Sequence, residues 1–145
     1  MKIEFTIHCI PPKHTAQGSN RILKHKNGSR FIGKKSDSNA IKTKNMLISI
    51  FKEKAPLKPL LRAIKLDVLW VYPYRKSESK KIIKSCQLKP CDKQPDVDNL
   101  MKILLDVMTK CGFWKNDGQI AEIRFRKFWS YEPMIKISIE EIEEI

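Results

Sequence analysis

The chain has 145 residues, of which 41% are hydrophobic and 31% charged, and its formal net charge is +13. This globular composition predicts a single domain over residues 1–145, because a chain of this length buries about two thirds of its unfolded surface. No apolar run approaches the roughly 20 residues of a membrane-spanning helix, and the first residues alternate in character, unlike a signal peptide. We therefore expect a cytoplasmic protein without a membrane partner.

The excess of basic residues points to a polyanionic partner. Lysine and arginine total 29 against 16 aspartates and glutamates, and four of these acids fall in an acidic tail at 140–145. A positive excess of this size repels itself in the folded protein, and binding to nucleic acid offsets that repulsion. Charge alone leaves a second interpretation open, in which the surface is simply basic and soluble.

The N-terminal half begins with a strand and ends with a helix. Residues 3–9 alternate between polar and apolar, which predicts a half-buried strand. Residues 13–38 are rich in basic and small polar residues with few apolar anchors, so we expect a flexible basic loop. Such a segment is either a solvated loop or an arm that orders on nucleic acid. Residues 39–54 carry an approximate apolar stripe that predicts a helix, ended by the prolines that follow.

The C-terminal half combines three strands with the clearest helix of the chain. Residues 64–72 predict a strand that becomes central in a sheet. Residues 75–93 form the densest basic segment and lack a period, so we expect a second flexible loop. Apolar residues from Val97 onward recur at helical spacing until a glycine, and two more strands follow at 121–129 and 135–139. The expected fold is α/β (α+β), one small domain with a mixed four-stranded sheet and two main helices.

Two aspartates stand at the start of the second helix. Asp96 and Asp98 can cap free backbone N–H groups there and complement the helix dipole. They can also hold a divalent cation, because Mg²⁺ prefers oxygen ligands from a few carboxylates together with substrate phosphates. Lys102, one turn after Asp98, is either a surface ion-pair partner or a cation for a phosphate. Asp117, taken alone, is a turn residue of an Asp-Gly pair.

A family resemblance is carried by two runs of residues. They are Pro95-Asp96-Val97-Asp98-Asn99-Leu100-Met101-Lys102 and, after Leu105-Asp106, Gly112-Phe113-Trp114-Lys115-Asn116-Asp117-Gly118-Gln119-Ile120. Over residues 95–120 the chain resembles the RusA family of Holliday junction resolvases, and the order of elements around this segment is similar as well. The chain departs from some relatives at Asn116, where they carry a second acid.

The resemblance implies a specific enzyme. It places the catalytic, metal-binding aspartates on Asp96, Asp98 and Asp117, and the essential lysine on Lys102. It also implies a bacterial or phage-encoded homodimer that nicks a four-way DNA junction symmetrically, using Mg²⁺ with Mn²⁺ as a substitute. Two alternatives remain from the sequence: a non-catalytic nucleic-acid-binding protein, and a Mg²⁺-dependent nuclease that acts on flaps or duplex DNA.

Basic side chains are expected to follow the DNA arms through phosphate contacts, which carry little sequence information. Residues of 13–38 contribute to this surface, and Arg124 and Arg126 either join it or lie on a solvated strand face. The principal DNA-binding candidates are Arg75, Lys76, Lys80, Lys81, Lys84, Lys89 and Lys93.

Simple geometry limits how the three acids can meet. A helix over residues 98–111 is about 20 Å long. The six residues 112–117 reach roughly 20 Å at most when extended. Asp117 therefore joins Asp96 and Asp98 within one subunit only if this segment runs nearly straight back along the helix. Otherwise the helix is shorter, or the third carboxylate comes from a dimer partner.

Overall fold

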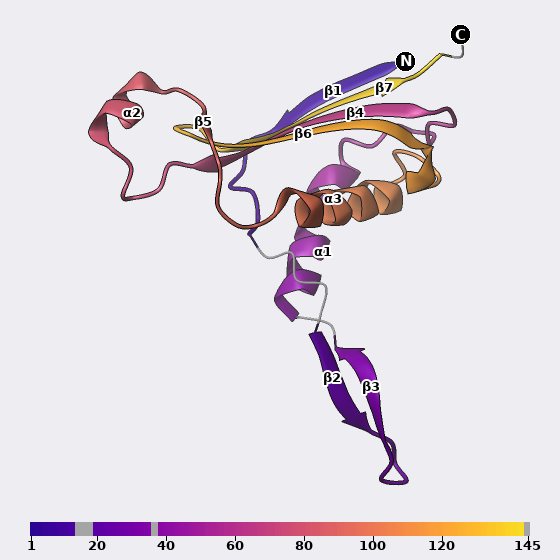
Figure 1. Cartoon of the computed structure of the whole chain (residues 1–145). Helices are drawn as coiled ribbons and strands as arrows, with labels where there is room; N and C mark the ends of the chain where they lie inside the picture. Colours follow the sequence, from indigo (N-terminus) through magenta and orange to yellow (C-terminus); the bar gives the residue numbers. More distant parts are fainter. Residues whose placement is uncertain (14–18, 36–37, 144–145) are drawn as a thin grey trace.

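The computed structural model describes residues 1–13, 19–35 and 38–143 (Figure 1). A five-stranded sheet has the order β1-β7-β4-β6-β5, and two longer helices, α1 and α3, lie on one of its faces. The strands of this sheet are β1 (Lys2–Ile7), β4 (Ile64–Pro73), β5 (Lys89–Pro90), β6 (Ile120–Ser130) and β7 (Met134–Glu141). The helices are α1 (Ser38–Lys52), α2 (Lys80–Ser85), α3 (Val97–Cys111) and the 3₁₀ turn η1 (Asp117–Gln119).

The sheet is mixed because β4 runs parallel to β6 and antiparallel to β7. The crossover from β4 to β6 contains α3, as parallel pairing requires a long connection. The predicted α+β class with a mixed sheet is therefore confirmed. The sheet has five strands instead of four, since β5 pairs with β6 over two residues and is too short to show a periodic pattern.

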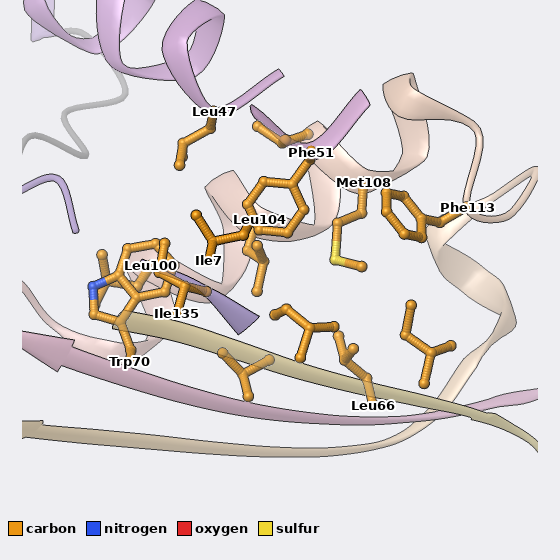
Figure 2. Packing of buried hydrophobic residues seen from close by; sticks show 14 of the residues in the cluster. Ile7, Leu47, Phe51, Leu66, Trp70, Leu100, Leu104, Met108, Phe113 and Ile135 are labelled. Carbon is orange, nitrogen blue, oxygen red and sulfur yellow. The ribbon is translucent and has the colours of Figure 1, made fainter. Parts of the chain in front are cut away.

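The hydrophobic core fills the space between the sheet and the two helices (Figure 2). Trp70 of β4, Leu104 of α3 and Phe51 of α1 are all fully buried within it. Val71 and Leu69 alternate with these core positions and face the other side of β4, which no helix covers in Figure 1. Core packing on one face therefore fixes α3 across the sheet, and with α3 the residues at both of its ends.

The basic segment 13–38 is not a loop throughout, which corrects the expectation. Strands β2 (Ser19–Lys24) and β3 (Arg30–Lys35) form a hairpin that projects away from the sheet (Figure 1). At its tip Gly28 has a φ of 88°, and the Asn27 side chain accepts hydrogen bonds from the Ser29 N–H and hydroxyl. The strands of this hairpin lack the regular polar-apolar alternation of a core strand, so the sequence pattern did not reveal them. Residues 14–18 and 36–37 lie outside the described residues.

Two further expectations need correction. Within 75–93 the chain forms α2, whose N-terminal N–H groups are capped by Ser79, and then β5. A helix of six residues is too short to reveal a period in the sequence, and α2 buries none of its residues. In the expected acidic tail, Glu140 and Glu141 belong to β7, while 144–145 lie outside the described residues. In the described part of the chain, no helix is long and apolar enough to cross a membrane.

Candidate active site

The start of α3 carries two carboxylates without a hydrogen-bond or ion-pair partner among the described residues. Asp96 occupies the N-cap position, but its side chain makes no capping hydrogen bond; its backbone carbonyl accepts one from the Leu100 N–H at 3.1 Å. Asp98 lies in the first helical turn, and both side chains are exposed. Neither carboxylate has a hydrogen-bond or ion-pair partner among the described residues. Capping, which the sequence offered as one explanation, therefore does not account for Asp96.

The chemistry of this pair fits a hard divalent cation. Two carboxylates on an open surface leave room for the water and phosphate ligands that Mg²⁺ retains in proteins. The positive end of the α3 dipole also lies here and attracts anionic groups such as a phosphate. Asp96 and Asp98 can therefore hold such an ion together with a substrate phosphate.

Asp117 lies in a turn that other side chains hold in place. The Asn116 side chain accepts a hydrogen bond from the Gly118 N–H at 2.7 Å, and Gln119 completes a capping box with the Asn116 N–H at 3.0 Å. The Gln119 amide also donates to the carbonyls of Leu60 and Arg62. Asp117 itself is exposed, and its carboxylate has no partner among the described residues. Asp117, which the sequence alone explains as a turn residue, therefore does not stabilise this turn; Asn116 and Gln119 do.

The acids lie at opposite ends of α3. This helix has 15 residues and a length of about 22 Å. A second route along β6 agrees: Lys127 donates to the Pro95 carbonyl at 2.6 Å, and the strand rises about 23 Å over the seven steps from Ile120 to Lys127. In the part of the chain that the structure describes, no three acidic, histidine or cysteine side chains gather at a metal-binding distance. The three-carboxylate site is therefore not formed within one chain.

The segment after α3 takes this course because it bonds to a loop beside the sheet. Phe113 accepts a backbone hydrogen bond from the Leu60 N–H at 2.9 Å, and Trp114 forms a β-bridge with Leu60. Both aromatic side chains are buried in the core. These contacts direct residues 112–116 toward the start of β6 instead of back along the helix.

Lys102 lies on the exposed side of α3, one turn after Asp98. Its side chain has no ion-pair or hydrogen-bond partner among the described residues, whereas Asp106, a turn further on, pairs with Lys44 of α1 at 3.2 Å. Lys102 is therefore free to bind an anion close to the acid pair.

The seven basic candidates of 75–93 divide into two groups. Arg75 and Lys89 are held by Glu78, whose side chain is 3% exposed and lies 3.6 and 2.7 Å from them. Both cations also lie over the ring of Trp129. The hydrogen bond from Lys89 and the charge of Arg75 hold the pKa of the Glu78 carboxyl below its usual range.

The second group is unpaired in the described part of the chain. These side chains show no such contacts, and those of Lys76, Lys80, Lys81, Lys84 and Lys93 are exposed. The Arg75-x-x-Glu78 spacing is a signal in the sequence for the Arg75 pair, whereas the pair of Lys89 with Glu78 has no local signal.

The uncovered face of the sheet is nearly balanced in charge. Arg126 pairs with Asp67 at 3.0 Å, and Lys65 lies near Glu122 at 3.9 Å. Arg124 is exposed on the same strand as Arg126. Because Arg126 is committed to Asp67, this face favours the solvated-strand interpretation for that residue over a DNA contact.

One residue near the site was missed from the sequence. The Lys127 side chain of β6 donates hydrogen bonds to the carbonyls of Lys93 and Pro95, immediately before Asp96. The signal was a break in the alternation of β6, where a lysine stands between Phe125 and Trp129 at a position that faces the core.

The sequence is similar to known proteins and to one protein family. The chain is 30% identical over 146 residues to the crossover junction endodeoxyribonuclease rusA of Lactococcus phage r1t, covering 98% of this chain and all of that protein. It is also 36% identical over 55 residues to the uncharacterized protein YqaN of Bacillus subtilis, covering 38% of this chain and 37% of that protein. Residues 10–140 match the model of the family described as endodeoxyribonuclease RusA. The chain therefore belongs to the RusA family of endodeoxyribonucleases.

Proposed function

We propose that this endodeoxyribonuclease resolves four-way DNA junctions by paired nicks that depend on Mg²⁺, with Mn²⁺ as a substitute. Each catalytic centre combines Asp96 and Asp98 of one subunit with Asp117 of the partner subunit in a homodimer. The observation that supports this most is that the carboxylates at both ends of α3 have no side-chain partner among the described residues. Asp96 makes no capping hydrogen bond, and Asn116 and Gln119, not Asp117, cap the turn. Family membership and the full-length phage relative support the junction as the substrate.

Dimer symmetry accounts for the separation of the acids. A two-fold axis that exchanges the two ends of α3 brings each acid pair toward the turn of the other subunit. The same operation creates both centres at once, so a dimer carries two equivalent sites. A four-way junction presents two equivalent strands, and two equivalent sites suit symmetric nicking.

The residues of the site divide the work of phosphodiester hydrolysis. A divalent ion, when bound, lowers the pKa of a water ligand and polarises the phosphate. Asp96, Asp98 and Asp117 supply anionic oxygen ligands for it. Lys102 balances the negative charge that develops on the scissile phosphoryl group.

Two basic surfaces hold the DNA arms. The first is the lobe formed by residues 75–93, which contains α2 and its exposed lysines. From α2 the chain continues through β5 to the start of α3 (Figure 1). The second is the tip of the β2–β3 hairpin, where Lys24, Lys26 and Arg30 are all exposed. Arg75 and Lys89, bound to Glu78, brace the lobe.

The decisive experiment compares substrates and metal together. Cleavage of a four-way junction, a linear duplex and a flap of the same sequence is measured as Mg²⁺ is raised from zero, with wild-type protein and Asp117→Asn. We expect wild type to cut the junction at least tenfold faster than the other substrates, and Asp117→Asn to bind the junction without cutting it. Equal rates on all substrates contradict junction resolution, and intact cleavage by Asp117→Asn contradicts the catalytic assignment.

A further inference from the structure

Lys127 occupies a position that the pattern of β6 reserves for apolar residues. Ile123 and Phe125 pack against the core on one side of it, and Trp129 is part of the core on the other. Lys127 is paired in register with Trp70, which is fully buried. A charged side chain at such a position costs stability unless its donors are satisfied.

The ammonium group of Lys127 is satisfied by a single short segment of the chain. It donates to the carbonyl oxygen of Lys93 and, at 2.6 Å, to that of Pro95. Two of its three N–H donors are thereby used on the residues that precede Asp96. The alkyl stem lies along the core face while the charge reaches the edge of the sheet.

The same stretch of β6 also holds the backbone of this segment. Lys89 pairs with Trp129 and Pro90 with Phe128, and the Cys91 N–H donates to the Lys127 carbonyl at 2.9 Å. Lys127 is thus the last contact in a series that guides the chain from β5 to the start of α3. Beyond it, Asp96 has no side-chain bond of its own to fix its direction.

We propose that Lys127 is a positioning residue for the carboxylate pair Asp96 and Asp98. It holds the 93–95 segment so that both acids face the same bound ion, and its positive charge offsets their mutual repulsion. The proposal rests on the proposed function of that pair. Groups that orient metal ligands typically change metal affinity or activity by about 10- to 100-fold when removed.

Methionine is the informative substitution because it keeps the stem and removes the donors. Lys127→Met places an unbranched apolar side chain in an apolar register, so the fold is expected to survive. Lys127→Arg keeps the charge and several donors and should restore much of the function. Lys136→Met makes the same chemical change at an exposed residue of β7 and serves as the matched control.

The experiment uses the full chain and three measurements. The first is the Mg²⁺ concentration for half-maximal junction cleavage at saturating DNA. The second is hydrogen exchange of the amides in 92–98 without DNA, and the third is unfolding by urea. For Lys127→Met we expect about a tenfold higher Mg²⁺ requirement, faster exchange confined to 92–98, and an unfolding midpoint close to that of Lys136→Met.

Each contrary result has a distinct meaning. An unchanged Mg²⁺ requirement together with unchanged exchange overturns the positioning role. Global unfolding of both Lys127→Met and Lys127→Arg also overturns it, because Lys127 is then a brace of the fold. If wild type does not cleave junctions, the proposed function fails, while unchanged exchange in Lys127→Met still decides against the contact between Lys127 and the segment.

Discussion

The backbone beside the acids is held by different kinds of side chain at the two ends of α3. At the start, a cation anchors the chain, since Lys127 bonds to the two carbonyls that precede the acid pair. At the far end, neutral amides do this work, with Asn116 and Gln119 holding the turn that carries Asp117. In both places the carboxylates are left without partners. This difference fits the proposal that Lys127 offsets the repulsion between two acids at the first end, whereas the second end carries a single acid.

The distance between the two ends of α3 decides whether one subunit can bring its own acids together. A straight helix of about 22 Å keeps the two half-sites apart in every conformation in which α3 is intact. Under the proposed assignment of Asp96, Asp98 and Asp117 as ligands, a lone subunit would have an incomplete set. Activity should then depend on which variants are paired in a dimer. Pairing variants substituted at opposite ends of α3 therefore gives the sharpest test.

Mixing two inactive variants is expected to give the largest effect. Asp98→Asn and Asp117→Asn should each lower cleavage by more than about 100-fold, because each removes an anionic ligand from both centres. A heterodimer of the two has one centre with both substitutions and one centre with none. We expect mixing to restore nicking of one strand, measured on a junction with separately labelled strands. If every mixture stays inactive, the acids do not meet across the dimer.

Removing the lysine beside the acid pair should have the next largest effect. Lys102→Met deletes a cation that acts on charge formed in the transition state, so kcat should fall by about 100-fold or more. Binding of the junction in the absence of divalent metal should stay within about twofold. Lys42→Met on the exposed side of α1 is the control and should retain full activity. A loss confined to affinity, with kcat preserved, would assign Lys102 to DNA binding.

The hairpin should affect binding without affecting chemistry. Replacing Lys24, Lys26 and Arg30 with glutamine removes three phosphate-binding charges. The slope of log affinity against log salt should become shallower by about three, since each neutralised phosphate contributes roughly 0.9. The control replaces Lys2, Lys65 and Lys136 on the uncovered sheet face with glutamine and should leave the slope close to that of wild type. Equal losses in both triple variants would mean that net charge alone governs binding.

The smallest effect is expected at Glu78, in the brace of the lobe. Its carboxyl has a pKa below the reference value of 4.5, so it stabilises the fold above that pH and loses this effect as pH falls. Glu78→Gln should therefore unfold more easily than wild type at pH 7, and the difference should shrink toward pH 3. Urea unfolding at several pH values measures this. A difference that is constant with pH would show that Glu78 acts through packing instead of charge.

The sequence predicted those features that are written in local patterns. The helix from Val97 to the glycine at 112 has a regular apolar stripe, and both of its ends were placed correctly. The hairpin was missed because its two short strands do not alternate between polar and apolar residues. The position of Asp117 was beyond local reasoning, since it depends on the contacts of Phe113 and Trp114 with Leu60.

The site residues show the same division. The acids and Lys102 were proposed as site residues because they stand in two short sequence motifs, and this assignment stays a prediction. Lys127 lies about 30 residues from Asp96 and Asp98 in sequence, and its contact with the segment 93–95 is visible only in the folded chain. The ion pairs of Arg75 and Lys89 with Glu78 could not be read from the sequence, because it does not show how deeply Glu78 is buried.

The pairing of the first strand with the last one shapes how the protein is made. β1 is an edge strand whose neighbour in the sheet is β7, and the Glu141 N–H donates to the Met1 carbonyl at 3.1 Å. During synthesis on the ribosome, β1 emerges long before β7 and has no partner until β7 has been made. Such distant pairing slows folding. The sheet is therefore completed late. In a chain released before β7 is made, β1 has no strand to pair with, and its inner face stays exposed.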